Sequence, residues 1–205
     1  MEYDEDILHA LRPEVLLAAY LEGIFPMVQD GELWWFRPDP RGLMPLDERF
    51  HVSRRLRRTV RAGRYVCTRD RAFRAVVRCC ARRHRPSQVW ISPEIEIAYT
   101  HLHELGFAHS VEAWAGGSEG RGEPVGGLYG VAIGGAFFAE SMFHTARDAG
   151  KVALVHCVEH LRQQGFAMMD VQWTTENLKR FGAYELPDED YRTLLAEAAS
   201  RPVEY

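Results

Sequence analysis

The sequence predicts an α+β fold, with helices in the first half of the chain and a largely antiparallel sheet in the second. Apolar residues recur at helical spacing up to residue 106, and from residue 108 they alternate with polar residues as in strands. Glycine-rich turns separate the alternating segments, and one long helical segment interrupts them. Together these patterns indicate a sheet in which one helix crosses over before a later strand.

The first expected element is a helix over residues 7–22, which ends at Gly23 because glycine favours helix termini. An aromatic stretch follows and leads into a proline-rich turn at residues 38–41. We expect these segments to form a small N-terminal domain, residues 1–46, ahead of a larger domain, residues 47–205.

Basic helices open the larger domain. A helix over 53–63 begins at a serine, which is a favourable N-cap, and a short strand at 65–68 separates it from a basic helix over 70–83. A third helix is expected over 92–105, because it begins with serine followed by proline and is followed by glycine.

The second half of the chain is expected to supply most of the sheet. The expected strands span residues 108–114, 125–131, 136–143, 166–172 and 183–186. The expected helices span residues 148–164 and 174–181. Within the second of these strands, Gly126, Gly127 and Gly130 are expected to relax the backbone for the close approach of a ligand.

Composition restricts the class of protein. The chain has 205 residues, of which 46% are hydrophobic and 26% charged, as in a globular protein with a sizeable core. No apolar run reaches the ~18 residues of a membrane span, and the acidic start lacks the basic region of a signal peptide. We expect a cytoplasmic protein without membrane contact. Four cysteines without a metal-binding spacing are expected to be buried free thiols: Cys67, Cys79, Cys80 and Cys157.

Charge is strongly segregated along the chain. Between Arg49 and Arg85 there are fourteen arginines and one acid, a balance of +13, whereas the rest of the chain carries −17. Lysine occurs only twice. A preference for arginine over lysine does not explain why the arginines are concentrated in one segment. Because arginine binds phosphate oxygens bidentately and stacks on bases, the segment predicts a surface for a polyanion such as a nucleic acid.

Two acids stand where apolar strands end. Glu140 and Asp170 each follow a run of Phe, Met or Ala, and Gln172 lies two residues beyond Asp170. Alternate residues of a strand share a face, so Asp170 and Gln172 are expected to point the same way. Carboxylates in apolar surroundings need a partner, and these residues therefore predict a pocket for a cationic group.

Other motifs match known sites only in part. His156 and His160 have the spacing of zinc ligands on a helix, but the glutamate of the zincin pattern is misplaced, so no metal is expected. The segment Arg147–Val152 partly matches a loop that binds the coenzyme A pyrophosphate, and Val152 would crowd the phosphate. No cofactor is therefore expected.

Nine ordered segments resemble the leucyl/phenylalanyl-tRNA–protein transferases over nearly the whole chain. They are Gly23–Pro26, Trp34–Arg41, His51–Arg54, Val89–Ser92, Ala98–Gly106, Ala108–Glu112, Val125–Val131, Glu140–Phe143 and Asp170–Gln172. The resemblance implies an acetyltransferase-like (GNAT-like) C-terminal catalytic domain. It also implies transfer of Leu, Phe or Met from aminoacyl-tRNA to proteins that begin with Arg or Lys, which marks those proteins for degradation. A monomer is expected.

The resemblance also implies roles for individual residues. Asp170 and Gln172 would be the catalytic pair, Glu140 would hold the donor's amino group, and Trp90 would stack on the terminal adenosine, with Met27 beside it. The donor side chain would lie among Leu128, Met142, Leu154 and Met169. Phosphates of the tRNA would meet Arg54, Arg55, Arg57, Arg58, Arg61, Arg82 and Arg83.

The chain departs from the family pattern at several positions. Met27 stands where a tryptophan is usual, and Asn177 stands where a histidine is usual. Cys157 and Leu161 stand in the helix of the donor pocket where Phe is common, which predicts that Phe and Met are accepted at least as well as Leu. The remaining departures are Ala139, Gly150, Asp188 and Glu189.

Two further functional classes are compatible with parts of the sequence. A non-catalytic RNA-binding protein would keep the basic helices and tolerate the departures in the site. A coenzyme A-dependent N-acetyltransferase would need the intact pyrophosphate loop, which this chain lacks. Peptide-bond formation from aminoacyl-tRNA distinguishes the transferase from both.

Overall fold

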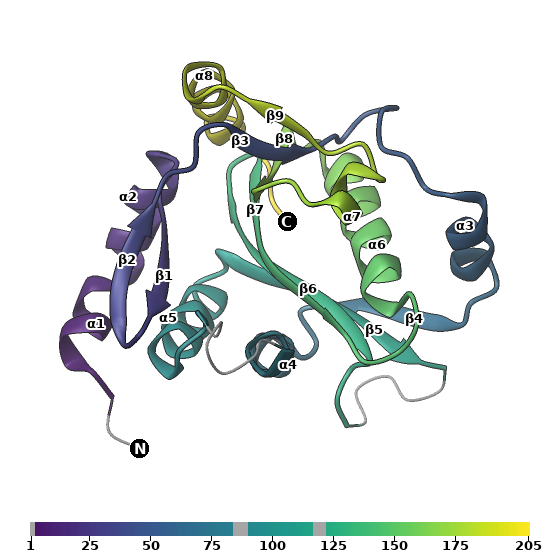
Figure 1. The fold of residues 1–205 in the computed structure, drawn as a ribbon, viewed down its shortest axis with the longest axis horizontal. Helices are drawn as coiled ribbons and strands as arrows, with labels where there is room; N and C mark the ends of the chain where they lie inside the picture. The colour runs from purple at the N-terminus through teal and green to yellow at the C-terminus, as the bar shows by residue number, and fades with distance from the viewer. Residues whose placement is uncertain (1–2, 84–89, 117–121) are drawn as a thin grey trace.

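The computed structural model describes residues 3–83, 90–116 and 122–205 and contains two sheets (Figure 1). The elements are α1 (Glu5–Ala10), α2 (Pro13–Leu21), β1 (Phe25–Gln29), β2 (Glu32–Phe36), β3 (Arg41–Met44), α3 (Arg54–Arg61), β4 (Tyr65–Arg69), α4 (Phe73–Arg83), α5 (Pro93–Glu104), β5 (Ala108–Ala115), β6 (Gly126–Ile133), β7 (Ala136–His144), α6 (Ala149–Gln164), β8 (Met168–Gln172), α7 (Glu176–Lys179), β9 (Tyr184–Leu186) and α8 (Asp188–Ala199). β1 and β2 form a hairpin, and the other strands form one sheet in the order β4-β5-β6-β7-β8-β3-β9. The predicted α+β class is confirmed.

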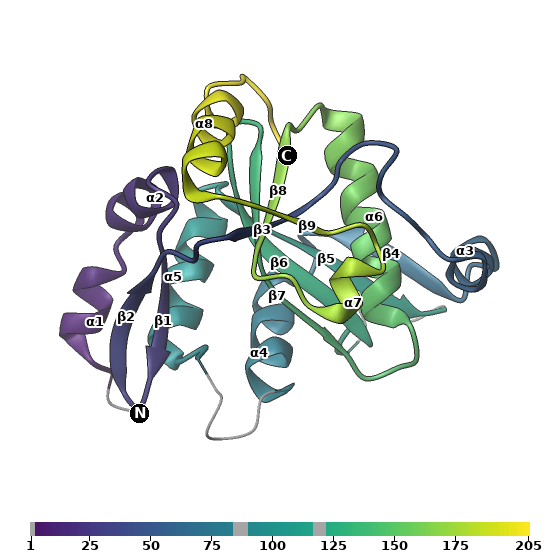
Figure 2. The same cartoon turned by 45° about the horizontal axis from the view of Figure 1, so that its top comes forward.

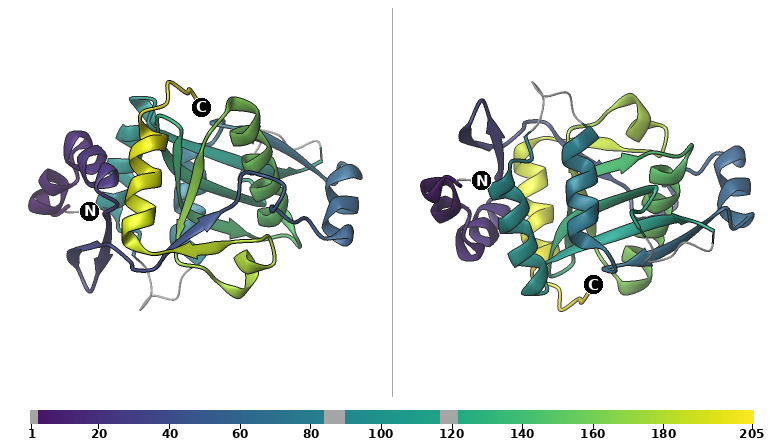
Figure 3. Two further views of the ribbon diagram at one scale, coloured as in Figure 1. Left: turned by 90° about the horizontal axis from the view of Figure 1, so that it is seen from above. Right: turned by 90° about the horizontal axis from the view of Figure 1, so that it is seen from below.

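The larger sheet is mostly antiparallel, as the sequence predicts, with one parallel contact between β7 and β8. That contact follows from α6, which crosses over between these two strands, because parallel neighbours need a long connection. α4 and α5 cover one face of the sheet, and α6 covers the other (Figure 3). Each face has its own apolar core, the first around Phe73, Tyr99 and Tyr129 and the second around Leu128 and Val155.

The prediction of one helix over residues 7–22 is wrong. Pro13 begins a second helix, α2, because its ring fixes the backbone for a first helical position and it has no N–H to donate. Asp4 caps the first helix, α1, through the backbone N–H of Ile7 at 3.0 Å. The aromatic stretch that follows, which the sequence did not identify as strands, forms the hairpin β1–β2.

β3 connects the N-terminal elements to the larger sheet. Its four residues are all buried, and it lies between β8 and the edge strand β9 (Figure 2). β3 pairs with β8, whose end carries the predicted catalytic pair, and the register places Gly42 opposite Gln172. A side chain at Gly42 would lie 2.9 Å from the backbone of Trp173 and Thr174, so glycine is needed for this close approach.

The remaining helices largely follow the prediction. Ser53 caps α3 and Ser92 caps α5, each through a backbone N–H at 3.3 Å. The last helix, α8, was not predicted, and it packs on α2, β7 and β8 through buried Tyr191 and Leu195. Within the described residues, no helix is both long enough and apolar enough to cross a membrane.

Candidate functional site

A cavity of about 450 Å³ lies between the β1–β2 hairpin, the ends of β7 and β8, and the segment that follows β8. Eight residues predicted for the site line it: Met27, Trp90, Leu128, Glu140, Met142, Leu154, Met169 and Gln172. Residues not predicted also contribute to the wall: Phe25, Ala139, Ser141, Val171, Trp173, Thr175, Asn177 and Leu178. The structure thus brings together side chains from the hairpin, three strands and two helices, with Asp170 outside the lining.

The apolar end of the cavity is formed by the predicted donor pocket. Leu128 and Met142 are cross-strand partners on β6 and β7, so their side chains share a face. Leu154 reaches the same space from α6, and Met169 reaches it from β8. Cys157 and Leu161 are fully buried in α6 and are not part of the lining. The size of this pocket is therefore set by the four predicted residues and their neighbours Val171 and Leu178.

Glu140 enters the cavity from a β-bulge. Tyr129 pairs with Ser141 and Gly130 pairs with Ala139, so Glu140 is the extra residue on β7. A bulge changes the direction of a side chain relative to the regular alternation, which is common beside active sites.

The three glycines of β6 are needed for close packing within the protein and not for the approach of a ligand. A side chain at Gly130 would meet the carbonyl oxygen of Phe138 at 2.3 Å, so the ligand interpretation is wrong. A side chain at Gly126 would meet the backbone of Ala149 and Gly150 at 2.6 Å, and one at Gly127 would meet the carbonyl oxygen of Val111 at 2.8 Å.

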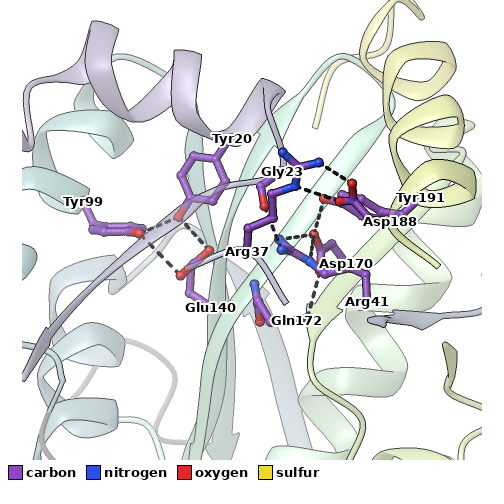
Figure 4. Close-up of polar contacts among 10 residues, drawn as sticks. All are labelled: Tyr20, Gly23, Arg37, Arg41, Tyr99, Glu140, Asp170, Gln172, Asp188 and Tyr191. Atoms are coloured by element: carbon purple, nitrogen blue, oxygen red, sulfur yellow. Dashed lines mark hydrogen bonds and ion pairs between the residues drawn. The ribbon is translucent and has the colours of Figure 1, made fainter. Parts of the chain in front are cut away.

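Two buried tyrosines hold the Glu140 carboxyl group (Figure 4). The Tyr20 hydroxyl on α2 donates to Oε1 at 2.7 Å, and the Tyr99 hydroxyl on α5 lies 3.4 Å from Oε2. The two hydroxyls also contact each other. Burial and the nearby Asp170 carboxylate raise the pKa of Glu140 to about 8, although Tyr20 and Arg41 oppose the shift. The group can therefore accept a cationic ligand by losing its proton.

The raised pKa of Glu140 predicts a pH-dependent stability. Between the ordinary glutamate pKa of ~4.3 and the folded value of about 8, the folded state keeps a proton that the unfolded state has lost. Stability therefore falls as the pH rises through this interval. We expect the melting temperature of the wild type to fall more between about pH 5 and about pH 8.5 than that of Glu140→Gln. Equal pH profiles for the two proteins would contradict the assignment.

Asp170 is fully buried behind the cavity, and its partner is a cation of the protein itself. Arg41 on β3 donates from Nε to both carboxylate oxygens at 3.0 Å and from Nη2 to Oδ2 at 2.8 Å (Figure 4). Tyr191 on α8 donates its hydroxyl to Oδ2 at 2.7 Å. The remaining donor is the backbone N–H of Gln172, 2.8 Å from Oδ1. Both side chains of the ion pair are at most 1% exposed.

Arg41 also joins the segment before the hairpin to β8. Its Nη1 donates to the carbonyl oxygen of Gly23 at 2.8 Å, immediately before β1. Its guanidinium lies between the rings of Phe25 and Tyr191, 4.9 and 4.8 Å from their centroids. An arginine held in this way by hydrogen bonds and ring contacts fixes three segments that are distant in sequence.

Gln172 presents its amide to the cavity from an unusual backbone conformation. Its φ is +58°, a left-handed value that is costly for a residue with a side chain, and the hydrogen bond to Asp170 holds it there. Nε2 of this buried side chain has no hydrogen-bond partner among the described residues. An unpaired amide inside a pocket is ready to bind a polar group of a ligand.

The expectation that Asp170 and Gln172 enter the pocket from one face is wrong. A second bulge leaves Val171 unpaired on β8, and the left-handed turn at Gln172 ends the regular alternation. Only Gln172 lines the cavity. Asp170 contacts it indirectly, through the backbone of Gln172.

The predicted arginines lie on two different surfaces. On α3, all five are exposed around the buried Leu56: Arg54, Arg55, Arg57, Arg58 and Arg61. Four of them line a shallow depression of about 160 Å³, and Arg55 is paired with Asp148. α3 packs on α6, whereas Arg82 is exposed on α4, on the other face of the sheet, and pairs with Glu123. The side chain of Arg83 lies outside the described part of the structure.

Sequence reasoning missed the buried polar partners of the site. Arg41 has a local signal, because it is a charged residue between a proline-rich turn and an apolar strand. Its pairing with Asp170 has none, because Asp170 lies 129 positions further along the chain. Tyr20 and Tyr99 lie on the apolar faces of their helices, and the sequence pattern there predicts ordinary core residues. Asp188, one of the departures from the family pattern, forms an ion pair with Arg37 at the start of α8.

Comparison with known families and proteins covers nearly the whole chain. Residues 43–196 match the family described as leucyl/phenylalanyl-tRNA protein transferase, and residues 9–39 match the N-terminal domain of the same family. Among solved structures, the C-terminal domain of a putative lysylphosphatidylglycerol synthetase from Agrobacterium fabrum is similar, with a TM-score of 0.43 at 13% identity. The match covers 91% of this chain and 57% of the Agrobacterium fabrum chain. A similarity this low does not assign a fold.

Curated relatives with the name leucyl/phenylalanyl-tRNA–protein transferase are much more similar. The protein of Akkermansia muciniphila is 50% identical over 190 residues, which is 92% of this chain and 96% of the relative. That of Herpetosiphon aurantiacus is 50% identical over 188 residues, 92% of this chain and 94% of the relative. The protein of Nitratidesulfovibrio vulgaris is 52% identical over 196 residues, which is 94% of this chain and 81% of the relative. The chain belongs to the leucyl/phenylalanyl-tRNA–protein transferase family of enzymes.

Proposed function

We propose that this protein transfers Leu, Phe or Met from aminoacyl-tRNA to the N-terminal Arg or Lys of a protein, which marks that protein for degradation. The observation that carries the proposal is the cavity itself, in which an apolar pocket, a carboxyl group and an unpaired amide meet. An aminoacyl ester of this kind offers one group to each of them: an apolar side chain, an ammonium group and a reacting carbonyl group.

The donor amino acid fits the polarity of the cavity. Its side chain would lie among Leu128, Met142, Leu154 and Met169, which suit unbranched or aromatic apolar groups. Its ammonium group would face Glu140, which loses its proton when a cation binds. A pocket of this type discriminates between single methylene groups by only ~1–3 kcal/mol, so Phe and Met are expected to be accepted at least as well as Leu.

The reaction is the aminolysis of an ester. The neutral α-amine of the acceptor attacks the donor carbonyl carbon, the new C–N bond forms, and the C–O bond to the ribose breaks. The proton lost by the amine ends on the departing ribose hydroxyl. We assign Gln172 to orient the attacking amine, which donates a hydrogen bond to the side-chain oxygen of this residue, and Asp170 with Arg41 to position Gln172. Orientation alone contributes ~7–11 kcal/mol in favourable cases.

The wider organisation of the protein follows from the same proposal. The tRNA would approach across the α3 arginines, and Trp90 and Met27 would receive the terminal adenosine at the cavity. We infer an acetyltransferase-like core made of β5, β6, β7, α6 and β8, because the crossover helix joins the one parallel pair. A monomeric cytoplasmic enzyme with domains at 1–46 and 47–205 completes the proposal.

A panel of donors and acceptors tests the proposed specificity. Leu-tRNA, Phe-tRNA, Met-tRNA and Val-tRNA are each incubated with peptides that differ only in their first residue, Arg, Lys or Glu. Mass spectrometry should detect products for the first three donors and only for the Arg and Lys peptides. N-terminal acetylation of the Arg peptide should abolish the product, because the reacting amine is blocked. Transfer to the Glu peptide, or from Val-tRNA at the same rate, would contradict the specificity.

The α3 arginines predict a salt-dependent interaction with tRNA. Replacing Arg54 and Arg57 by Glu should raise the KM for aminoacyl-tRNA and lower the slope of log KM against log salt by about one for each phosphate that is no longer bound. The control is Arg12→Glu with Arg192→Glu, the same charge change at exposed positions beside α2 and on α8, away from α3 (Figure 1). An unchanged slope in the α3 variant would mean that these arginines are a solvated surface only.

A further inference from the structure

We propose that Trp34 is a second base-stacking position, which binds the nucleobase that precedes the terminal nucleotide of the donor tRNA. The inference rests on the proposed function and names a binding residue outside the cavity lining. In the hairpin β1–β2, Trp34 is 52% exposed. Among the described residues, the Trp34 ring has no aromatic partner.

The hairpin register places Trp34 on the side of the cavity. Residues directly opposite each other in an antiparallel pair project to the same face. Trp34 is opposite Met27, and Phe36 is opposite Phe25. Phe25 and Met27 both line the cavity, and the rings of Phe25 and Phe36 stack at 6.1 Å. Trp34 therefore continues the cavity-lining face by one position, onto the outer strand of the hairpin.

With Trp90 receiving the terminal adenosine, as proposed above, the donor leaves the cavity past Trp90 and the hairpin. Its aminoacyl ester lies inside, whereas the unpaired CCA end connects it to the body of the tRNA outside. Trp90 lines the cavity, and its carbonyl oxygen accepts the backbone N–H of Val28 at 3.2 Å, so the hairpin and Trp90 are held together. A tryptophan beside this exit offers a flat apolar surface, on which any base can stack.

The surroundings of Trp34 limit the site to one nucleobase. The next pair on this face is Gln29 with Glu32, and an exposed carboxylate there repels a phosphate backbone. The neighbouring Trp35 is opposite Pro26 and therefore belongs to the other face of the hairpin. Met27 supplies a thioether rather than an aromatic ring, and the rings of Phe25 and Phe36 stack on each other. On this hairpin face, Trp34 is therefore the ring that offers a surface to a base.

A series of donors of increasing length tests the proposal. Phe is esterified to adenosine, to the dinucleotide CpA and to tRNA, and KM is measured for the wild type, Trp34→Ala, Trp34→Phe and Trp35→Ala. For Trp34→Ala we expect KM to rise about tenfold with the CpA and tRNA donors, the range of one lost base stack. KM for Phe-adenosine should stay unchanged. Trp34→Phe should recover most of the loss, and Trp35→Ala should behave as the wild type.

Binding without turnover keeps this inference separate from the proposed activity. Adenosine and the unacylated trinucleotide CpCpA are titrated against the same proteins. The ratio of the two dissociation constants gives the gain in affinity from the added nucleotides, and this gain is compared between the wild type and each variant. The gain should be present in the wild type and about tenfold smaller in Trp34→Ala. An equal gain in both proteins, an equal loss in Trp35→Ala, or a loss that extends to adenosine would overturn the proposal. Failure of all donors to react would instead contradict the proposed function.

Discussion

Replacing Asp170 by Asn should lower the rate of transfer at saturating donor by about 10²–10⁴, the range of acid–base and orienting groups in active sites. The carboxylate accepts from Arg41, Tyr191 and the backbone N–H of Gln172. An asparagine has one acceptor oxygen, and its NH₂ group would face the donors of Arg41 or Tyr191. The backbone N–H of Gln172 and the guanidinium of Arg41 would therefore compete for this one oxygen. The hydrogen bond that holds Gln172 in its left-handed conformation would weaken as a result.

The kinetic signature distinguishes positioning from a general loss of folding. KM for the donor should change little, because the donor pocket does not contain Asp170. Tyr191→Phe is the matched control: it removes one hydrogen bond to the same carboxylate and leaves the charge, so its effect should be near tenfold, about one hydrogen bond. If Asp170→Asn transfers at the wild-type rate in a single turnover with saturating Phe-tRNA, the residue has no part in the reaction.

Replacing Arg41 by Met should have the largest effect on stability. The side chain is 1% exposed, and its removal leaves the fully buried Asp170 carboxylate without its cation. Breaking a buried ion pair on one side costs about 3–5 kcal/mol of unfolding free energy. The hydrogen bond to Gly23 and the packing of the guanidinium between the rings of Phe25 and Tyr191 are removed as well. Urea denaturation should show a lower midpoint at an unchanged slope.

A double variant separates the stability of the ion pair from its function. Arg41→Met combined with Asp170→Leu removes both charges and leaves apolar side chains of similar bulk, a replacement that is often neutral for stability. We expect the denaturation midpoint to recover most of the loss while transfer remains as low as in Asp170→Asn. Recovery of activity together with stability would show that the pair only stabilises the fold.

Much of the candidate site could be predicted because its residues follow simple periodicities. Leu128, Met142 and Met169 lie on predicted strands, and Leu154 lies on a predicted helix, so their burial was readable from the alternation. Glu140 and Gln172 stood out as polar groups at the ends of apolar runs. Resemblance to the family supplied their roles, and the structure supplies their common cavity.

The remaining features depend on contacts that have no local signal. The bulges at Glu140 and Val171 and the left-handed Gln172 reverse the side-chain alternation, and one such change moves a residue to the other face of a strand. The ion pair between Asp170 and Arg41 joins segments far apart in sequence. The domain boundary at residue 46 stays a prediction, and β3, just before it, is part of the larger sheet.

The donor preference stays a prediction, and the structure changes the residues on which it depends. The prediction relied on Cys157 and Leu161 in the helix of the pocket, but both are buried in the core and neither lines the cavity. A smaller side chain there changes the pocket indirectly, through the core that Cys157 and Leu161 share with Leu154 and Met169. The expectation that Phe and Met are accepted therefore depends on the lining residues themselves.

The proposed transfer is tested most directly by a single-turnover reaction of the wild-type protein with Phe-tRNA and a peptide that begins with Arg. Protein in excess is mixed with radiolabelled Phe-tRNA, and bound tRNA and labelled peptide are measured in the same samples. We expect the label to move from bound tRNA to the N-terminus of the peptide and deacylated tRNA to accumulate in equal amount. Full binding of the tRNA without any labelled peptide would contradict the proposed transfer and would leave an RNA-binding protein.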